Sequence, residues 1–484
     1  MRPTHRGANP GRTCVRAVDT RGPSRADRAA VYTGRVTPRT ALLGLVACAA
    51  ACSFDQGFDG TRYQCGGGER CPDGQRCVAG VCQASADDAG PDGATDAGPD
   101  GAMPPATCGG IELLRDTFDG NGAGPYWSAF ADPGASATEA GGHLVLSLPA
   151  ASTAYAGYRA RYYYDLRGTA ATARVAQVGG ANNILEVRNQ FGNAAQLVYD
   201  GSEVYAGIFN APGAGTLAQR PWNPAETFWR IRESGGALIW ELSTDGQSWS
   251  ELHRRAVPFA IEHVQGVLAA GDSGAAASVT RFDDLNATTP AGQFCPVDQL
   301  HDDFAVAPLQ PQWEPYWDTG CAIDETGGAL RATYTVGTGN AFCGVTSLHL
   351  WDLSRGDGVT VDGAAFPSRQ NFVSYVAAGV PGSDDRIEMT LDGTAFEYRI
   401  YAGGSAVAVH PMTIDRAQHR YWRMRGAGTT AIWETSLDRS TWTERWRATA
   451  PFALTGLELN IGFGHYDVSP GTPFTVALPG VNAD

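Results

Sequence analysis

Apolar and polar residues alternate over short runs along most of the chain from residue 107 onward. These runs are rich in aromatic and β-branched residues, and turns that contain glycine separate them. Long stretches with the helical period of about 3.6 residues are missing from this part of the sequence. The pattern therefore predicts an all-β fold in which short antiparallel strands form a sandwich or a barrel.

One hairpin can be registered from the sequence alone. The dipeptide Gly235-Gly236 predicts a two-residue turn that places Arg230 opposite Glu241. The same register places Ile231 opposite Trp240 on the other face of the two strands. A later copy of the pattern has the turn Gly428-Thr429 and pairs Met424 with Trp433 and Arg423 with Glu434.

The chain from residue 107 contains an internal duplication. Seven short motifs recur in the same order at an offset of 186 to 193 residues. The paired motifs begin at Cys108 and Cys295, Asp116 and Asp302, Glu139 and Glu325, Tyr164 and Trp351, Phe228 and Tyr421, Ile239 and Ile432, and Pro258 and Pro451. A period this long corresponds to two whole domains and not to a solenoid. We expect one β-sandwich in residues 107–290 and a second in residues 294–484.

The motifs in each copy follow the order Asp-x-Phe, Gly-Gly-x-Leu, Trp-x-Arg-x-Arg, a Trp-Glu strand and Ser-x-Asp-x-x-x-Trp. This order resembles the concanavalin A-like lectin/glucanase superfamily, in its laminin-G-like branch, over residues 108–290 and 295–484. The resemblance implies that each copy is a jelly roll of two sheets whose ends lie together. It also implies a disulfide between Cys108 and Cys295, and we expect a second one between Cys321 and Cys343.

The N-terminal region has the layout of a targeting signal. A short apolar run at residues 41–51 follows Arg39 and ends on small residues and cysteine, as in a signal peptide with a lipoprotein cleavage site. The run is too short to cross a bilayer, which takes about 20 apolar residues. We expect residues 1–51 to be a leader and signal peptide, with the true start nearer Val31 or Val36. The protein is then a secreted lipoprotein of the outer membrane or cell surface, and not a cytoplasmic protein.

Two cysteines are candidates for the lipid. Cys48 ends the better lipobox, Leu-Val-Ala-Cys, whereas cleavage before Cys52 leaves a longer apolar region ahead of the site. Lipidation at Cys52 also leaves eight cysteines downstream, an even number that can pair completely in an oxidising compartment. We favour Cys52 and keep Cys48 as the alternative.

Residues 52–82 contain the cysteine spacing Cys-x5-Cys-x5-Cys-x4-Cys and too few apolar residues for a core. They resemble the Cys-rich module that follows the lipid cysteine in surface lipoproteins of GC-rich Gram-negative bacteria. We expect the disulfides Cys65–Cys77 and Cys71–Cys82. Zinc is the alternative, although the spacing differs from paired Cys-x2-Cys knuckles. Residues 83–106 repeat Asp, Ala, Gly and Pro and predict a disordered linker.

The chain is acidic, with a formal net charge of −15 at pH 7. It contains no lysine, so all 36 basic residues are arginine, which is typical of a GC-rich bacterial genome. An acidic surface repels phosphate backbones and anionic lipids. Nucleic acid is therefore excluded as a partner, and we expect membrane contact only through the lipid anchor.

No catalytic motif stands out. The segment Gly271-Asp-Ser-Gly274 resembles the nucleophile loop of chymotrypsin-like proteases, but the histidine context is missing and a turn explains it better. The carboxylate pattern of superfamily glucanases, Glu-x-Asp-x-x-Glu, and the zinc motif His-Glu-x-x-His are both missing. We therefore expect no enzyme, no metal and no cofactor; calcium enters only through the family resemblance.

Aromatic side chains carry the binding hypothesis, because sugar rings stack on exposed indole and phenol rings. The surface candidates are Trp127, Trp222, Trp317 and Trp351. The ion pairs Arg230–Glu241 and Arg423–Glu434 either hydrogen-bond sugar hydroxyls or serve as structural contacts. We expect non-catalytic binding of a polysaccharide or surface glycan. The alternatives are a structural or adhesive protein that binds other proteins, and an unrecognised glycoside hydrolase.

Overall fold

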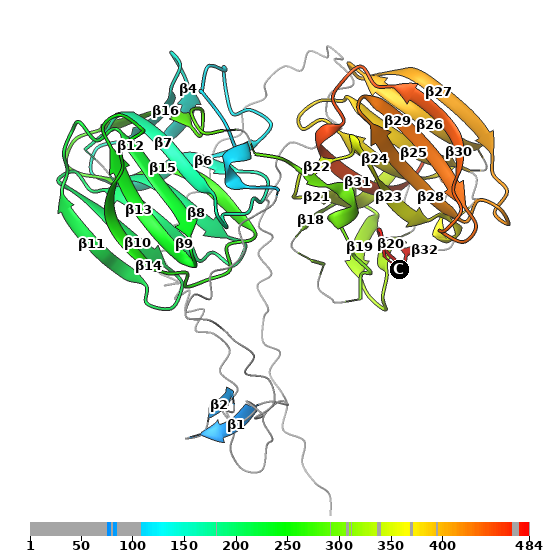
Figure 1. Cartoon of the computed structure of the whole chain (residues 1–484), viewed down its shortest axis with the longest axis horizontal. Coiled ribbons are helices and arrows are strands. Elements are labelled where there is room, and N and C mark those ends of the chain that lie inside the picture. The colour runs from blue at the N-terminus through cyan, green and yellow to red at the C-terminus, as the bar shows by residue number, and fades with distance from the viewer. Residues whose placement is uncertain are drawn as a thin grey trace, which may run out of the picture. The chain divides into compact units, whose positions relative to one another are not determined.

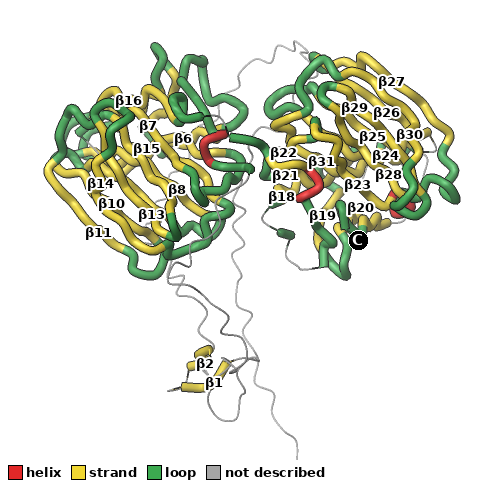
Figure 2. The backbone as a smooth tube through the Cα atoms, viewed as in Figure 1, coloured by secondary structure: helices red, strands yellow, loops and turns green. Residues whose placement is uncertain are grey.

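The computed structural model describes residues 75–78, 81–84, 108–180, 182–290, 292–305, 309–310, 312–335, 340–367, 371–393, 395–466 and 474–483. Within these ranges the chain is built from strands and three short 3-10 helices: η2 (Ile111–Leu113), η3 (Val297–Gln299) and η4 (Gly363–Ala365) (Figure 2). The predicted fold class, all-β with tandem jelly-roll sandwiches, is confirmed. No helix in the described ranges is long and apolar enough to cross a membrane.

The N-terminal module is described only as a hairpin of β1 (Gln75–Val78) and β2 (Val81–Ala84). The two strands are antiparallel, and their register places Cys77 opposite Cys82. The expected partners Cys65 and Cys71 lie outside the described residues, so these two disulfides stay predictions. The lipidation candidates and the linker also lie outside the described residues.

The first repeat is a sandwich of two seven-stranded sheets. Its strands are β3 (Trp127–Ala131), β4 (Ser136–Glu139), β5 (Leu144–Leu148), β6 (Ser152–Ala160), β7 (Ala170–Gln177), β8 (Asn182–Asn189), β9 (Ala194–Tyr199), β10 (Glu203–Phe209), β11 (Gly215–Pro221), β12 (Phe228–Ser234), β13 (Ala237–Ser243), β14 (Ser250–Ala256), β15 (Val264–Ser273) and β16 (Ser278–Leu285). The β8 sheet has the order β11-β10-β9-β8-β15-β6-β3, and the β13 sheet has the order β14-β13-β12-β7-β16-β5-β4 (Figure 1). Neighbouring strands are antiparallel throughout, as in a jelly roll.

The second repeat has the same plan with one sheet divided. Its strands are β17 (Cys295–Pro296), β18 (Trp313–Trp317), β19 (Cys321–Glu325), β20 (Leu330–Tyr334), β21 (Ala341–Ser347), β22 (Trp351–Asp352), β23 (Arg355–Asp362), β24 (Phe372–Gly379), β25 (Arg386–Asp392), β26 (Ala395–Ala402), β27 (Ser405–Thr413), β28 (Tyr421–Ala427), β29 (Thr430–Ser436), β30 (Thr443–Thr449), β31 (Thr455–His465) and β32 (Phe474–Leu478). The β25 sheet has the order β17-β22-β31-β24-β25-β26-β27, with β21 also on β31 and β18 on β21. The facing layer consists of the β29 sheet, β23-β28-β29-β30, and the β20 sheet, β19-β20-β32.

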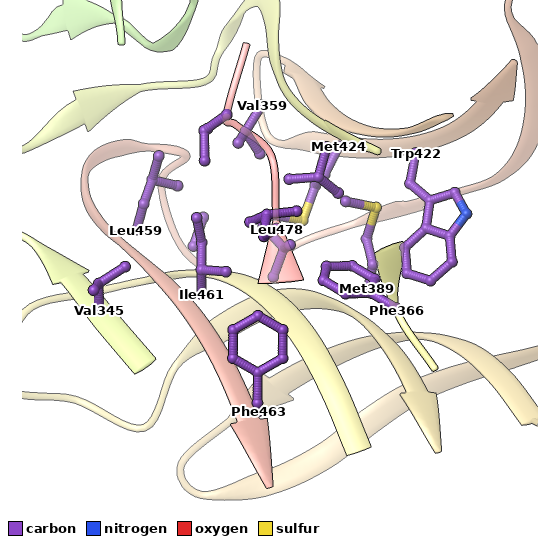
Figure 3. Packing of buried hydrophobic residues seen from close by; sticks show 14 of the residues in the cluster. Val345, Val359, Phe366, Met389, Trp422, Met424, Leu459, Ile461, Phe463 and Leu478 are labelled. Atoms are coloured by element: carbon purple, nitrogen blue, oxygen red, sulfur yellow. The ribbon is translucent and has the colours of Figure 1, made fainter. Parts of the chain in front are cut away.

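Each repeat encloses a hydrophobic core of its own. Trp229 and Trp240 are fully buried in the first, and Trp422 and Trp433 occupy the corresponding hairpin in the second. Figure 3 shows the second core, where Trp422 lies among side chains from strands of both facing layers. These indoles come from strand positions that alternate with polar residues, so alternation correctly assigned them to the interior.

The predicted hairpin register is confirmed in both repeats. Arg230 pairs with Glu241 across β12 and β13, and Arg423 pairs with Glu434 across β28 and β29. The turn works because Gly235 and Gly236 take φ values of +62° and +75°, which a type I′ turn requires and which glycine adopts without strain.

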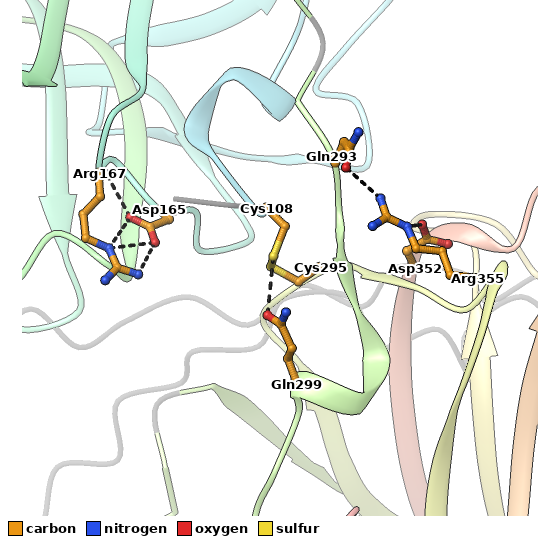
Figure 4. Close-up of a disulfide and its surroundings, with 8 residues drawn as sticks. All are labelled: Cys108, Asp165, Arg167, Gln293, Cys295, Gln299, Asp352 and Arg355. Atoms are coloured by element: carbon orange, nitrogen blue, oxygen red, sulfur yellow. Dashed lines mark hydrogen bonds and ion pairs between the residues drawn. A yellow bond between two sulfur atoms is a disulfide. The ribbon is translucent and has the colours of Figure 1, made fainter. Parts of the chain in front are cut away.

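The ends of the first repeat are tied together. Cys108, before η2, forms a disulfide with Cys295, the first residue of β17 (Figure 4). Beside it the Gly109 amide donates to the Gln293 carbonyl at 2.6 Å. A second disulfide joins Cys321 of β19 to Cys343 of β21 and so links the two layers of the second sandwich. Both pairings are those expected from the sequence.

The recurring Asp-x-Phe motif closes each sandwich. Asp116 accepts hydrogen bonds from the Phe118 amide and from Trp127 Nε1, both at 2.7 Å. Asp302 accepts from the Phe304 amide at 2.8 Å and from Trp313 Nε1 at 2.7 Å. The carboxylate therefore fixes the first turn of the repeat to the first strand of the sheet, and it satisfies a buried indole N–H.

Candidate functional site

Two of the four tryptophans expected at the surface are buried. Trp127 is 5% exposed and donates its indole N–H to Asp116, and Trp351 is 7% exposed beside His349. Neither presents a ring face to solvent, so both are corrected to core residues. The sequence reading failed because it did not find the acceptor that lets Trp127 be buried, eleven residues earlier in the chain.

The other two candidates lie apart, in different repeats. Trp222 follows β11 in the first repeat and is half-buried against Tyr199, with ring centroids 4.7 Å apart. Trp317, the last residue of β18 in the second repeat, is 59% exposed. Among the four tryptophans proposed from the sequence, Trp317 therefore offers the most surface to a ligand.

The four charged candidates form two copies of one compact cluster. Arg230 Nε lies 2.6 Å from Glu241 Oε2, and Arg232 donates to both carboxylate oxygens at 2.9 and 3.1 Å. The Arg230 guanidinium also lies 3.8 Å from the ring centroid of Trp249. Burial opposes the charge, but hydrogen bonds from both arginines hold the pKa of Glu241 below its usual value.

The second copy repeats this arrangement. Arg423 and Arg425 both donate to Glu434, at 2.7 Å and 3.0 Å, and Arg423 lies 4.1 Å from the ring centroid of Trp442. Burial and then the two arginines shift the pKa of Glu434, with a net lowering. Because both oxygens of each glutamate already have guanidinium partners, these clusters fit the structural alternative: they cover the solvent face of the hairpin.

The structure places exposed aromatic rings elsewhere, on the solvent face of the β8 sheet. Phe130 of β3 pairs with Gly157 of β6, and Tyr155 of β6 pairs with Gly271 of β15. A Cβ atom on Gly157 would lie 2.8 Å from the Phe130 ring, and one on Gly271 would lie 2.1 Å from the Tyr155 ring. The two rings, 38% and 39% exposed, therefore reach over backbone that only glycine leaves open.

The β25 sheet of the second repeat has a related feature, in which the two rings are half-buried. Tyr316 of β18 pairs with Gly344 of β21, and a Cβ on Gly344 would lie 2.5 Å from the Tyr316 hydroxyl. Phe342 of β21 lies over Gly464 of β31, where a Cβ would come within 2.2 Å of the ring. We call each pair an aromatic platform: Phe130 and Tyr155 in the first repeat, Tyr316 and Phe342 in the second.

The two platforms occupy corresponding places in the duplicated fold. Trp127 and Trp313 each begin the first strand of the sheet and each donate to the aspartate of the Asp-x-Phe motif. Phe130 and Tyr316 both lie three residues beyond that tryptophan. The platform is thus a property of the sandwich that survived the divergence of the two copies.

Polar groups surround the platform of the second repeat. The Tyr316 hydroxyl lies 2.7 Å from the Tyr375 hydroxyl and donates to Asn460 Oδ1 at 2.9 Å. Asn460 Nδ2 in turn donates to Thr346 Oγ1 at 3.0 Å. Burial is the largest cause that raises the pKa of Tyr375 to about 12, so this phenol stays protonated. The network fixes both tyrosine rings in place.

A charged cluster continues the same face on β25 and β26. Glu388 Oε2 accepts from Arg386 Nε at 2.9 Å, and Glu388 Oε1 accepts from Thr390 at 3.0 Å. Arg399 of β26 donates to Glu388 at 3.4 Å and also pairs with Glu397. These groups are hydrogen-bond donors and acceptors on the same solvent-facing side of the sheet as Tyr375.

The corresponding face of the first repeat is more apolar. A small cluster there joins Ile184, Val198, Val267 and Ala269, with Tyr205 packed against it. Its buried carboxylate, Glu186, is 7% exposed and is held by Gln196 and Arg188. The two copies therefore share the platform and differ in the chemistry beside it.

Sequence reasoning missed the platforms because they depend on pairing between strands that are distant in the chain. One signal was present in β31, where Gly462 and Gly464 alternate with the buried residues Ile461 and Phe463. Glycine at two successive outward positions of a strand marks a place where another group approaches the backbone. Among the described residues, no group of three or more His, Cys, Asp and Glu side chains could hold a metal ion.

No protein-family model matches the chain, and no curated protein matches it. The chain is similar to solved structures at low identity. A Bacillus licheniformis β-glucanase is 14% identical, with a TM-score of 0.29 over 38% of this chain and 95% of that chain. Lectin I-B4 from Griffonia simplicifolia is 13% identical, with a TM-score of 0.24 over 33% and 93%. A xylan β-1,4-xylosidase from Bacillus halodurans C-125 is 11% identical, with a TM-score of 0.30 over 73% and 64%. Similarity at this level carries no information about the ligand or the activity of this chain.

Proposed function

We propose that this protein binds carbohydrate without catalysis, through the solvent faces of the β8 and β25 sheets. The observation that carries the proposal is the aromatic platform, which is present in both repeats. Sugar rings stack on aromatic faces through their C–H groups, and this stacking needs a ring held flat and open to solvent. Glycines lie beneath Phe130, Tyr155, Tyr316 and Phe342, and the first two of these rings are exposed while the other two are half-buried.

An aromatic ring over a strand glycine also stabilises a sheet, so the ring alone does not define a binding site. The second repeat adds the polar groups that a sugar requires. Tyr375, Asn460 and Arg399 face the same side of the sheet as the platform. Ligand sites combine apolar faces with a few fixed hydrogen-bonding groups in this way.

The carboxylates beside the platform favour binding over hydrolysis. A glycosidase uses one carboxyl group as a proton donor and a second as nucleophile or base. Glu388 and Glu397 both contact the Arg399 guanidinium, and Glu388 also accepts from Arg386. Because guanidinium groups already occupy these two carboxylates, neither is open to a glycosidic bond. We therefore propose that the site holds its ligand unchanged.

The cellular location proposed from the sequence is compatible with carbohydrate binding. The signal-like segment favours a lipoprotein of the cell envelope, with lipid on Cys52 or, alternatively, on Cys48. Two platforms on one chain can engage one polymer at two points, which strengthens binding beyond either contact alone. A polysaccharide at or outside the outer membrane suits both features.

A protein ligand is the second candidate function. The exposed rings of Phe130 and Tyr155 on the β8 sheet favour it, because exposed apolar side chains also mark protein interfaces. In this hypothesis the first repeat binds a protein partner, and the hydrogen-bond network around Tyr375 has no part in binding. It predicts that a purified protein partner, and no polysaccharide, protects the β8 sheet from hydrogen exchange.

The proposal is tested by screening the full chain on a glycan array, followed by the double variant Tyr155→Ala/Phe342→Ala. We expect binding to at least one polysaccharide and a loss of about tenfold in the variant. Phe191→Ala is the matched control, because Phe191 is 73% exposed but lies in the turn after β8. A blank array, or equal losses in the control and the double variant, would refute the proposal.

A further inference from the structure

The solvent faces of the β8 and β25 sheets meet at an ion pair between the two repeats. The amide of Arg161 donates to the Tyr126 carbonyl at 2.8 Å, so the pairing of β6 with β3 continues one residue beyond β6. Strand alternation then places Arg161 on the same face as Gly157. Its guanidinium lies 3.9 Å from the carboxylate of Glu314, which shares a face of β18 with Tyr316. The two solvent faces are therefore contiguous at this ion pair.

Buried contacts hold the two repeats in this arrangement. The Tyr162 hydroxyl donates to Glu458 Oε2 at 2.7 Å, and the Tyr163 amide donates to the Leu348 carbonyl, also at 2.7 Å. Leu350, between β21 and β22, is buried in the hydrophobic core of the first repeat. An exposed ion pair contributes little to stability. The buried contacts, and not the ion pair, therefore fix the orientation of one repeat against the other.

The first repeat presents an aromatic ring and polar groups on its side of the ion pair. Phe130 is 38% exposed and reaches over Gly157, which is four residues from Arg161 along β6, or about 13 Å. Ser128 and Arg159 form the exposed cross-strand pair between them. A hydroxyl and a guanidinium group thus lie between the ring and the ion pair.

The second repeat presents aromatic rings on the other side. Tyr316 is two residues from Glu314 along β18, or about 7 Å, and it shares its face with Phe342 of the neighbouring strand β21. Tyr466 follows β31 and is 43% exposed, with its ring centroid 5.4 Å from that of Phe342. Aromatic side chains therefore lie on both sides of the ion pair, in two different repeats.

The ion pair itself is open to a ligand. The side chains of Arg161 and Glu314 are 37% and 55% exposed, and their separation of 3.9 Å is longer than a hydrogen bond. Guanidinium N–H groups and carboxylate oxygen atoms can therefore hydrogen-bond the hydroxyl groups of a sugar at this point.

Resting on the function proposed above, we propose that the ligand is an extended polysaccharide and that one chain of it contacts both platforms, passing over Arg161 and Glu314. Rings for stacking alternate along this surface with donors and acceptors for hydroxyl groups, which is the chemistry that a chain of sugars requires. The two platforms then act as parts of one site. Because buried contacts already fix the repeats, contact with the second platform requires no further ordering of the protein.

The length of the ligand and the stoichiometry of binding test this proposal. The full chain is first screened by affinity electrophoresis in gels that contain barley β-glucan, xylan, galactomannan or alginate. Fragments of the polymer that retards it, from disaccharide to dodecasaccharide, are then titrated into the full chain by isothermal titration calorimetry. We expect affinity to rise at least tenfold with length, and one long fragment to bind each protein molecule.

The possible failures are distinguishable. Two long fragments bound to each protein molecule, or an affinity that does not change with length, would overturn the single continuous site while leaving carbohydrate binding intact. No retardation by any of the four polymers would refute the proposed function itself, and this inference with it.

The residue-level test removes a contact on each side of the ion pair and one at the ion pair. We expect Phe130→Ala and Phe342→Ala each to weaken binding of the long fragment about tenfold, and Arg161→Ala about threefold. The matched control is Arg254→Ala, which breaks the exposed Arg254–Glu251 ion pair on the β13 sheet of the first repeat and is expected to bind as the wild type does.

Near-ultraviolet circular dichroism establishes that all four variants are folded. A site confined to one repeat would be weakened by only one of the two phenylalanine substitutions, so an unchanged affinity in either folded variant overturns the proposal. An Arg161→Ala variant that binds the long fragment as tightly as the wild type does overturns the passage of the ligand over the ion pair.

Discussion

The hydroxyl groups of Tyr316 and Tyr375 lie 2.7 Å apart, and both side chains occupy the space above Gly462. A Cβ atom on Gly462 would lie 2.3 Å from the Tyr316 hydroxyl and 2.3 Å from Tyr375 Cζ. Real Cβ atoms do not come this close, so both rings would have to move. Because glycine has no Cβ, position 462 leaves room both for the Tyr316 ring and for its hydrogen bond with Tyr375.

Gly462→Ala is predicted to displace both rings and abolish the ordered platform. We expect a destabilisation of about 1–3 kcal/mol from overpacking. At a temperature where the variant stays folded, we also expect it to lose polysaccharide binding, measured by affinity electrophoresis in a gel that contains the polysaccharide. Gly122→Ala is the control, because a Cβ at Gly122 meets no atom within 4 Å. Wild-type binding by a folded Gly462→Ala variant would show that the platform is not the ligand contact.

Asp302→Ala is predicted to destabilise the second repeat strongly. Its carboxylate accepts from the Phe304 amide and from Trp313 Nε1, and Trp313 is only 3% exposed. Loss of a charged acceptor that leaves a buried donor unpaired costs about 1.5–3 kcal/mol. Urea denaturation measures the loss.

The neighbouring substitution Asp303→Ala provides the comparison. Asp303 is exposed and accepts from the Ala305 amide at 3.0 Å. We expect its removal to cost less than about 1 kcal/mol. Similar losses for the two aspartates would contradict the role assigned to the Asp-x-Phe motif.

The sequence predicted those parts of the fold that depend on neighbours close in the chain. The turn at Gly235 and Gly236 set the register of Arg230 and Glu241, because both strands of that hairpin lie next to a turn with one allowed conformation. The duplication allowed the same strand register to be predicted a second time, at Arg423 and Glu434. Local rules suffice where one turn fixes the pairing.

The candidate site was not predictable in the same way. Phe130 becomes an exposed ring only because β3 pairs with β6 and brings Gly157 beneath it, and no local signal specifies that pairing. Trp127, three residues earlier, is buried because Asp116 satisfies its indole N–H from outside the strand. Whether an aromatic residue in an irregular segment is exposed depends on such distant partners. Within a regular hairpin, the alternation of inward and outward positions determines its exposure.

The stability of the protein is predicted to fall as the pH drops below about 6.5. His263 Nδ1 and His349 Nε2 lie 3.0 Å apart where the two repeats meet. Burial, followed by the charge of His263, lowers the pKa of His349 to about 3, and burial is also the main cause that lowers the pKa of His263. Glu262 and Asp165 oppose the shift at His263, and Arg167 adds to it.

The sign follows from proton binding. Between the folded and unfolded pKa values the unfolded chain holds a proton that the native pair does not, so stability is present above about pH 6.5 and is progressively lost toward pH 3. His349→Asn is expected to flatten this slope in urea denaturation measured from pH 7 to pH 4. Measurement at pH 8, where both histidines are neutral, separates the packing cost of the substitution. An unchanged slope in the variant would contradict the assignment.

The last prediction concerns the two disulfides, which close loops of very different length. Cys108 and Cys295 are 187 residues apart, and Cys321 and Cys343 are 22 residues apart. A cross-link stabilises mainly by restricting the unfolded chain, and the effect grows with the logarithm of the loop length. This relation gives the longer loop an advantage of about 2 kcal/mol. We therefore expect Cys108→Ser/Cys295→Ser to lower the unfolding free energy more than Cys321→Ser/Cys343→Ser, as measured by urea denaturation under oxidising conditions. The reverse order would mean that the link between the layers of the second sandwich stabilises the folded state directly, because chain entropy alone cannot favour the shorter loop.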